Sequence, residues 1–285
     1  MNAILPSEIL DFINGKSDIK AALIGCRAHH PEISYPCCEY DVAIIDQRII
    51  QPKIINIGNN IIEFANFSST QIKNINSNII PICDFCNLQD VHNFPKMLIA
   101  EGRHNLIEAL FNLGKIDLMY KSGRENLVLA SLILEISSYD ILLGILQNHG
   151  IKSMPIHEIN QLRNLDTQPD VVNQAIQTAL ECIGMDRATR SSIDRRIKAF
   201  QQIFGLREDF PLIMKKINFL LKSKLLTDCY YYVGKVTSSY LKMESNIFFN
   251  YPKLTHVAMD MSNDFEKMKK MAGDLKVLCK KIIRA

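Results

Sequence analysis

The stretch that decides the fold is ALIGCRAHHPEISYPCCEYDVAII, residues 22–45. It begins as an apolar strand, breaks at Gly25-Cys26, and returns with Glu39 and Asp41 directly ahead of the apolar run 42–45. Because successive side chains of a strand point to opposite faces, Glu39 and Asp41 are predicted to share one face. Two carboxylates beside a core run are costly unless something neutralises them. The pattern therefore raises the question of a bound cation.

A third carboxylate, Glu63, lies inside the run IIEFANF (61–67), where a solvated acid is out of place. If its strand pairs beside the strand that carries Glu39 and Asp41, all three acids converge. Magnesium prefers oxygen ligands and keeps positions open for phosphate, so it is a natural occupant. The alternative is an edge strand whose polar face carries Glu39 and Asp41, with Glu63 paired to a lysine or arginine.

The turn at Gly25 adds a second feature to the acids. Glycine lets the backbone approach a ligand closely. If a helix begins after it, the backbone N–H groups of Cys26 to Ala28 can bind an anion. A phosphate at this turn and a metal on the carboxylates together predict a bound nucleoside triphosphate with its magnesium.

Length and composition are those of a globular protein with one large or two ordinary domains. The chain has 285 residues, of which 47% are hydrophobic and 22% charged. The longest candidate run, LVLASLIL (127–134), ends at Glu135 and is shorter than the roughly 18 residues of a membrane helix. The N-terminus carries Glu8 and Asp11 and no basic leader, so we expect no signal peptide and a cytoplasmic location.

The periodicity changes once along the chain, which predicts an α+β protein. Short strands rich in isoleucine are expected at 20–26, 39–45, 53–58, 60–67 and 78–83. Helical spacing begins near Asn93, and further helices are expected at 170–183, 189–204, 209–226 and 228–243, with one long apolar stripe over 254–279. We therefore predict a small mixed-sheet domain, 1–93, followed by an all-α domain, 94–285.

Charge is distributed unevenly between the two parts. Residues 1–95 have a net charge of −4, and residues 96–285 have a net charge of +7. Basic residues cluster at 187–198, 215–224 and 267–281, and Tyr230, Tyr231 and Tyr232 adjoin the second cluster. These groups can contact a nucleic-acid backbone and stack on bases, or bind one nucleotide, or simply form solvated helix faces.

The segment LIGCRA followed by EYDVAII resembles the signature of the DNA-polymerase-beta-type nucleotidyltransferase superfamily. In that superfamily a strand ends in Gly-Ser, a short helix follows, and an acid-x-acid pair opens the next strand, with a third acid on a later strand. Gly25-Cys26 is similar to the Gly-Ser, and Arg27 to the basic residue that often follows. The resemblance covers about residues 5–85 and includes no specific motif in the helical part.

The resemblance implies transfer of a nucleoside monophosphate from a triphosphate, with ATP as the expected co-substrate, to an acceptor hydroxyl on a small molecule, a protein or an RNA end. Two ions of Mg²⁺, or Mn²⁺, would stabilise the attacking oxygen and the leaving pyrophosphate. By the same resemblance, Glu39, Asp41 and Glu63 are the metal-binding and catalytic residues, and Glu63 accepts the proton. Gly25, Cys26 and Arg27 would bind the nucleotide.

The sequence departs from the superfamily pattern at two of these positions. Cys26 replaces the usual serine, and a thiol donates hydrogen bonds weakly. Glu39 replaces the usual aspartate, which lengthens the ligand arm. Two further hypotheses therefore stand beside the enzyme: a nucleotidyltransferase-fold binding protein without catalysis, and an RNA- or DNA-binding helical protein whose front domain is a platform.

Two other patterns favour less specific interpretations. His29, His30, Cys37 and Cys38, with CDFC (83–86), could bind zinc, but the usual spacing is missing and buried free thiols are the preferred interpretation. The methionines at 261, 268 and 271 are interpreted as core or a helix contact, and a homodimer that uses them is an open alternative. We expect no membrane partner.

Overall fold

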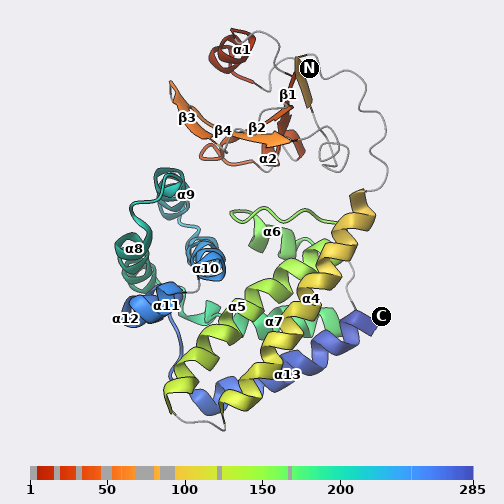
Figure 1. Ribbon diagram of the computed structural model, residues 1–285, viewed down its shortest axis with the longest axis vertical. Coiled ribbons are helices and arrows are strands. Elements are labelled where there is room, and N and C mark those ends of the chain that lie inside the picture. Colours follow the sequence, from red (N-terminus) through yellow and green to blue (C-terminus); the bar gives the residue numbers. More distant parts are fainter. Residues whose placement is uncertain are drawn as a thin grey trace. The chain divides into compact units, whose positions relative to one another are not determined.

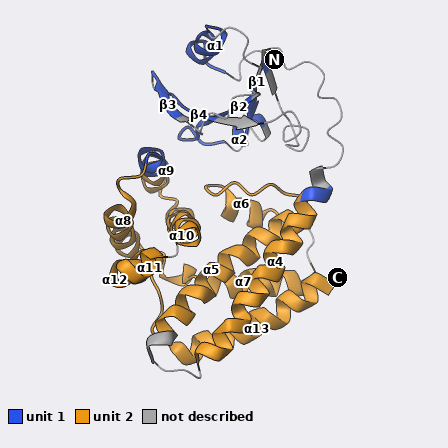
Figure 2. Cartoon of the chain, in the orientation of Figure 1, with its two compact units in different colours: residues 1–97, 208–216 blue, residues 98–207, 217–285 orange. Residues whose placement is uncertain are grey.

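A computed structural model of the chain describes residues 5–15, 20–29, 34–45, 53–58, 60–67, 80–83, 94–120, 124–165, 169–244 and 246–284. The chain divides into two compact units, which are coloured separately in Figure 2. Unit 1, the sheet unit, comprises residues 1–97 and 208–216. Unit 2, the helical unit, comprises residues 98–207 and 217–285. The α+β class expected from the periodicity is confirmed.

The sheet unit is built on a five-stranded mixed sheet (Figure 1). Its strands are β1 (Lys20–Ile24), β2 (Tyr40–Ile45), β3 (Lys53–Ile57), β4 (Asn60–Phe67) and β5 (Ile80–Cys83), in the order β3-β4-β2-β1-β5. β2 runs parallel to β4, and every other neighbouring pair is antiparallel. All five strands lie within a range that the isoleucine-rich runs had predicted.

One face of the sheet carries the core of this unit, because apolar side chains alternate along its strands. Leu23, Val42 and Ile62 are fully buried there. Helix α1 (Ser7–Asn14) packs on the same core through Ile9 and Ile13. The alternation leaves the opposite face of β2 and β4 for other side chains, and that face carries the acids.

Strands β3 and β4 form an antiparallel pair in which Ile57, the last residue of β3, is opposite Asn60, the first residue of β4. Gly58 has a φ of +57°, a value that glycine adopts without steric cost. Asn59, which follows this glycine in the sequence, lies outside the described residues.

The helical unit consists of a series of helices with short connections (Figure 1). Their bounds are α4 (Phe94–Met119), α5 (Arg124–Asn148), α6 (Glu158–Arg163), α7 (Asp170–Cys182), α8 (Arg190–Phe204), α9 (Phe210–Lys222), α10 (Leu226–Met243), α11 (Asn246–Asn250), α12 (Pro252–Met259) and α13 (Phe265–Arg284), with a 3-10 turn η1 (Met185–Arg187). The beginnings of α4 and α9 belong to the sheet unit.

Helices α4 and α5 approach closely at a pair of glycines. A β-carbon on Gly102 would lie 2.5 Å from the backbone nitrogen of Asn148 and 2.7 Å from the carbonyl oxygen of Gly144. Leu106, one turn along α4, is fully buried and contacts Gly144. Small residues here allow the two helix backbones to pack directly on each other.

The expected long helix over 254–279 is wrong, because the chain breaks between α12 and α13. Asp260 adopts the left-handed conformation with a φ of +59° and ends α12. Its carboxylate accepts a hydrogen bond from Tyr230 at 2.7 Å and pairs with Arg187 at 3.5 Å. Tertiary contacts thus stabilise a conformation that local helical periodicity does not reveal. The apolar stripe continues through the break because both helices face the same core.

One described helix segment, Leu127–Asn148, is long and apolar enough to cross a membrane. The apolar run 127–134 alone did not predict a segment of this length, because Glu135 follows it directly. In the structure 72% of this segment's most apolar window is buried within the protein. It also contains Glu135, which is completely buried. The segment is therefore a core helix of unit 2.

Candidate functional site

Three carboxylates meet on the polar face of the sheet in unit 1. Glu39 lies immediately before β2, Asp41 is the second residue of β2, and Glu63 lies in the middle of β4. The parallel register pairs Asp41 directly with Glu63. One oxygen from each of the three side chains lies within 4.8 Å of the others. The predicted convergence of the acids is therefore observed, and it depends on the pairing of two strands that are not consecutive.

The Gly25 turn lies directly beneath Asp41. Ile24, the last residue of β1, pairs with Asp41, and Gly25 follows with a φ of +75°. A β-carbon at position 25 would overlap the Asp41 carboxylate. Glycine is required here for two independent reasons, the backbone conformation and the space taken by the acid.

A lysine far away in the sequence completes the acid cluster. The Lys216 ammonium, which belongs to unit 1, lies 2.7 Å from Oε1 of Glu39. Both side chains are only 13% exposed, so the pair is shielded from water. The sequence placed Lys216 in a basic cluster but offered no signal for this partner, because 177 residues separate the two. The other oxygen of Glu39, Oε2, is buried and has no hydrogen-bond partner among the described residues.

The electrostatics of the cluster disfavour negative charge on Glu63. Burial is the largest influence that raises the pKa of its carboxyl, and the neighbouring charge of Glu39 raises it further. The Lys216 ammonium acts in the opposite direction. The Lys216 ammonium thus offsets only part of the effect that burial and Glu39 have on the pKa of Glu63.

Arg27 stabilises the loop that leads to Glu39. Its guanidinium donates to the backbone carbonyls of Cys38 at 2.8 Å and of Glu39 at 3.2 Å. It also lies over the ring of Tyr40, 4.2 Å from the ring centre. The sequence suggested contact with nucleotide for Arg27, whereas these contacts give it a role in positioning Glu39.

The helix after Gly25 is short and its first residues are engaged locally. Helix α2 covers only Cys26–His29, and the Ala28 amide donates to the Gly25 carbonyl at 3.2 Å. The Ala28 amide is therefore not free for the expected anion site. The Cys26 thiol is buried against the Cys38 thiol, and this contact, with burial, raises the pKa of Cys26. Cys26 thus remains a neutral thiol that faces another thiol.

The thiols elsewhere in the chain support the interpretation of buried free cysteines. Six described cysteines are free and buried: Cys26, Cys37, Cys38, Cys182, Cys229 and Cys279. The side chains of His29, His30, Cys83 and Cys86 lie outside the described residues. The zinc alternative that uses those four residues is therefore not tested.

The basic and aromatic cluster of the helical unit is largely internal. Tyr230, Tyr231 and Tyr232 are at most 3% exposed, so they are core residues and present no stacking surface. Arg196 is completely buried, donates to the Ala258 carbonyl at 2.8 Å, and lies over the Tyr230 ring. These residues cannot bind nucleic acid in this conformation.

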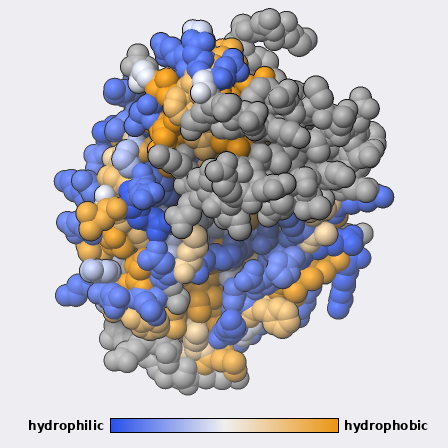
Figure 3. All heavy atoms as spheres, turned by 45° about the horizontal axis from the view of Figure 1, so that its top comes forward, coloured by the Kyte–Doolittle hydropathy of each residue, from blue (hydrophilic) through white to orange (hydrophobic). Residues whose placement is uncertain are grey.

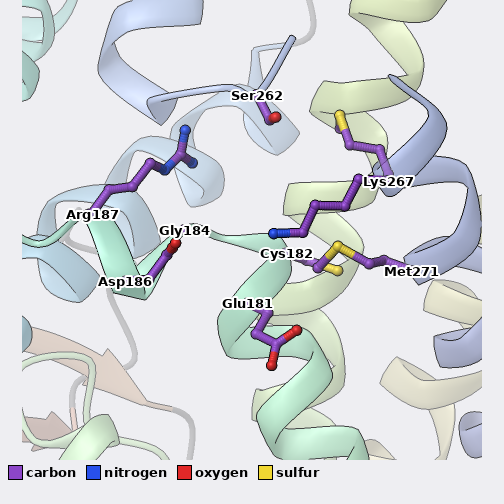
Figure 4. A pocket seen from close by; sticks show the side chains of 9 residues that line it. Glu181, Cys182, Gly184, Asp186, Arg187, Ser262, Lys267 and Met271 are labelled. Atoms are coloured by element: carbon purple, nitrogen blue, oxygen red, sulfur yellow. The ribbon is translucent and has the colours of Figure 1, made fainter. Parts of the chain in front are cut away.

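A cavity of about 100 Å³ lies within the helical unit at the end of α7 (Figure 4). The close-up shows the Lys267 side chain pointing toward Cys182 and Gly184. Arg187 also lines this cavity and is paired with Asp260. Its lining has one acid pair, Glu181 and Asp186, beside the basic Arg187 and Lys267, and it lacks the three converging carboxylates of the sheet unit. The acid cluster of the sheet unit therefore remains the candidate site.

Comparison with protein-family models finds no match to this sequence. No curated protein matches it either.

Proposed function

We propose that this protein is a nucleotidyltransferase that transfers a nucleoside monophosphate from a nucleoside triphosphate, ATP by expectation, to an acceptor hydroxyl. The observation that carries the proposal is the convergence of Glu39, Asp41 and Glu63 on one sheet face beside the Gly25 turn. Three carboxylate oxygens within 4.8 Å of one another repel, and divalent cations are the usual means of holding such a group together. The acceptor can be a small molecule, a protein or an RNA end.

The residues present fit a divalent cation of the Mg²⁺ or Mn²⁺ type. All three donors are carboxylate oxygens, which hard cations prefer. Glu39 Oε2 is a buried acceptor that lacks a hydrogen-bond partner within the described part of the chain, and a cation would satisfy it. When bound, such ions stabilise charge on the attacking and leaving oxygens of phosphoryl transfer.

The chain's own residues would then have distinct roles. Asp41 and Glu39 hold the cations, and Arg27 keeps Glu39 in place by binding the carbonyls of its loop. The backbone turn at Gly25 leaves room for the Asp41 carboxylate. Glu63 shares the cation site and accepts the proton of the acceptor hydroxyl.

The second candidate is a protein of the same fold that binds without catalysis. The observation in its favour is the ion pair of Lys216 with Glu39, because a resident ammonium partly replaces a metal. In that case Lys216 would stay on Glu39 and magnesium would not bind. The two candidates differ in a single measurable property, the dependence of nucleotide binding on magnesium.

The test is calorimetric titration of wild type with each nucleoside triphosphate, with and without magnesium, beside transfer of an α-labelled nucleotide to candidate acceptors. Asp41→Asn should abolish magnesium-dependent binding and transfer. Asp11→Asn, an exposed acid on α1 of the same unit, is the matched control and should behave as wild type. Binding that needs neither magnesium nor Asp41 would support the second candidate, and full transfer activity in Asp41→Asn would refute the site.

The cellular location and nucleic-acid binding are also part of the proposal. A cytoplasmic location suits an enzyme that uses a nucleoside triphosphate and magnesium, and it suits the buried state of the free thiols. Nucleic-acid binding by the helical unit is a weaker candidate. Its three adjacent tyrosines and Arg196 are buried, so phosphate contacts would depend on solvent-exposed lysines and arginines such as Arg190 and Arg195.

A further inference from the structure

Helix α4 presents large apolar side chains to solvent in unit 2. Phe111 is 71% exposed, Leu118 is 67% exposed and Ile107 is 40% exposed. The three lie on one face of the helix, because positions four and seven residues apart face the same way. The opposite face, with Leu106 and Leu113, is buried in the core. Exposed apolar side chains also appear among the polar atoms in the space-filling view (Figure 3).

Gly114 lies in the middle of this exposed face. No contact within the described residues requires a glycine at this position. A β-carbon at Gly114 would meet no described atom within 4 Å. Gly102 on the same helix, by contrast, packs directly against α5. Glycine within a helix costs about 1 kcal/mol relative to alanine, so an open position is unfavourable for the single chain. A helix that packs on this face would approach closely at Gly114.

Two opposite charges flank the exposed phenylalanine on the same face. Glu108 precedes Phe111 by three residues, and Lys115 follows it by four, and both are exposed. Lys115 donates to the Asn112 side chain at 3.0 Å, which holds its ammonium near this face. The order along the helix is acid, aromatic, base. When two such helices lie antiparallel, the acid of each therefore faces the base of the other.

We propose that two copies of this chain associate through an antiparallel pair of α4 helices, with a two-fold axis close to Phe111. A two-fold axis brings the same patch of both chains together, so each contact occurs twice. Glu108 of each copy then faces Lys115 of the other, and the two phenylalanines pack at the centre. Gly114 allows the close approach of the two backbones.

Helix α13 borders the proposed interface. Lys276 of α13 pairs with Asp117 of α4, and the Tyr120 hydroxyl donates to the Phe265 carbonyl at 2.6 Å. These contacts hold the two helices side by side within one chain. Val277 of α13, the residue after Lys276, is 53% exposed. The methionines at 261, 268 and 271, an alternative dimer contact suggested by the sequence, are buried within the single chain and take no part.

The oligomeric state of the full chain tests the proposal. Sedimentation equilibrium of wild type should give twice the chain mass of 32.5 kDa at micromolar concentrations. Phe111→Arg should reduce this to the mass of one chain. Phe249→Arg, at a phenylalanine of α11 that is 68% exposed, is the matched control and should leave the dimer unchanged. A wild type with the mass of one chain at every concentration would overturn the proposal.

Charge reversal tests the antiparallel register. Glu108→Lys and Lys115→Glu should each raise the dimer dissociation constant by about tenfold, because each places like charges opposite one another twice. The double variant should restore the wild-type value, and an equimolar mixture of the two single variants should form a heterodimer. A dimer that neither single variant weakens would exclude this register. Circular dichroism of each variant checks that the helices are intact.

Discussion

Gly25 and Asp41 occupy adjoining space across the β1–β2 pair, and a β-carbon on the glycine would overlap the aspartate carboxylate. Gly25 also has a φ of +75°. Gly25→Ala should therefore lower the free energy of unfolding by about 2 kcal/mol and displace Asp41, with loss of magnesium binding. Chemical denaturation and calorimetry measure the two effects. Gly273→Ala, at an exposed helical glycine with open space, should not destabilise.

Removal of Lys216 should make the sheet unit depend on divalent cations. Without its ammonium, the three carboxylates have lost a cation that lies 2.7 Å from Glu39. In EDTA we expect Lys216→Met to lower the free energy of unfolding by about 2 kcal/mol, since one partner of a shielded ion pair has been removed. Magnesium should then raise the melting temperature of the variant more than that of wild type.

The control for Lys216→Met is Lys222→Met, an exposed lysine on the same helix. It should change neither stability nor the response to magnesium. An identical magnesium-induced rise in melting temperature for wild type and Lys216→Met would show that Lys216 and the cation do not share the site.

Glu135 should make the protein less stable as pH rises. Burial raises the pKa of this fully buried carboxyl from 4.5 to about 8. Below pH 4.5 it is protonated in both the folded and unfolded states. Between pH 4.5 and 8 only the unfolded state ionises, so stability falls with rising pH, by up to 1.4 kcal/mol per unit from this group. Above pH 8 the loss is complete.

The measurement is the free energy of unfolding from pH 5 to pH 8. Glu135→Gln, which cannot ionise, should remove this decline and be more stable than wild type at pH 7. Glu181→Gln, at an exposed glutamate on α7, should keep the wild-type dependence. A parallel pH dependence in wild type and Glu135→Gln would mean that Glu135 is ionised in the folded protein.

Two glycines on α4 should respond oppositely to alanine. Gly102→Ala places a β-carbon 2.5 Å from the Asn148 backbone and should destabilise by about 2 kcal/mol, because α5 must move. Gly114→Ala meets open space and should stabilise by about 0.5–1 kcal/mol. Urea denaturation at low protein concentration gives both values. Equal effects at the two positions would contradict the close α4–α5 contact.

The strands and the faces of the sheet were accessible from sequence, because they depend on alternation between neighbouring residues. Glu39 and Asp41 were expected on one face, and Glu63 was expected to join them only if its strand paired beside theirs. The structure provides that pairing, with Asp41 directly opposite Glu63. The helix break at Asp260 was not accessible, because it is stabilised by Tyr230 and Arg187 from other elements. Local periodicity there is that of a continuous helix.

The sequence by itself determined that two acids follow a glycine turn and precede a core strand. It also determined that a helical part follows the sheet. Those features depend on residues close together in the chain. There the spacing of apolar side chains and the conformational freedom of glycine determine the local backbone structure. Only the tertiary structure decided that Lys216 pairs with Glu39, that Arg27 holds the loop, and that the tyrosines are buried. Each of these contacts joins segments that are distant in the sequence. Burial and charge pairing can therefore stabilise it only after the whole chain has folded.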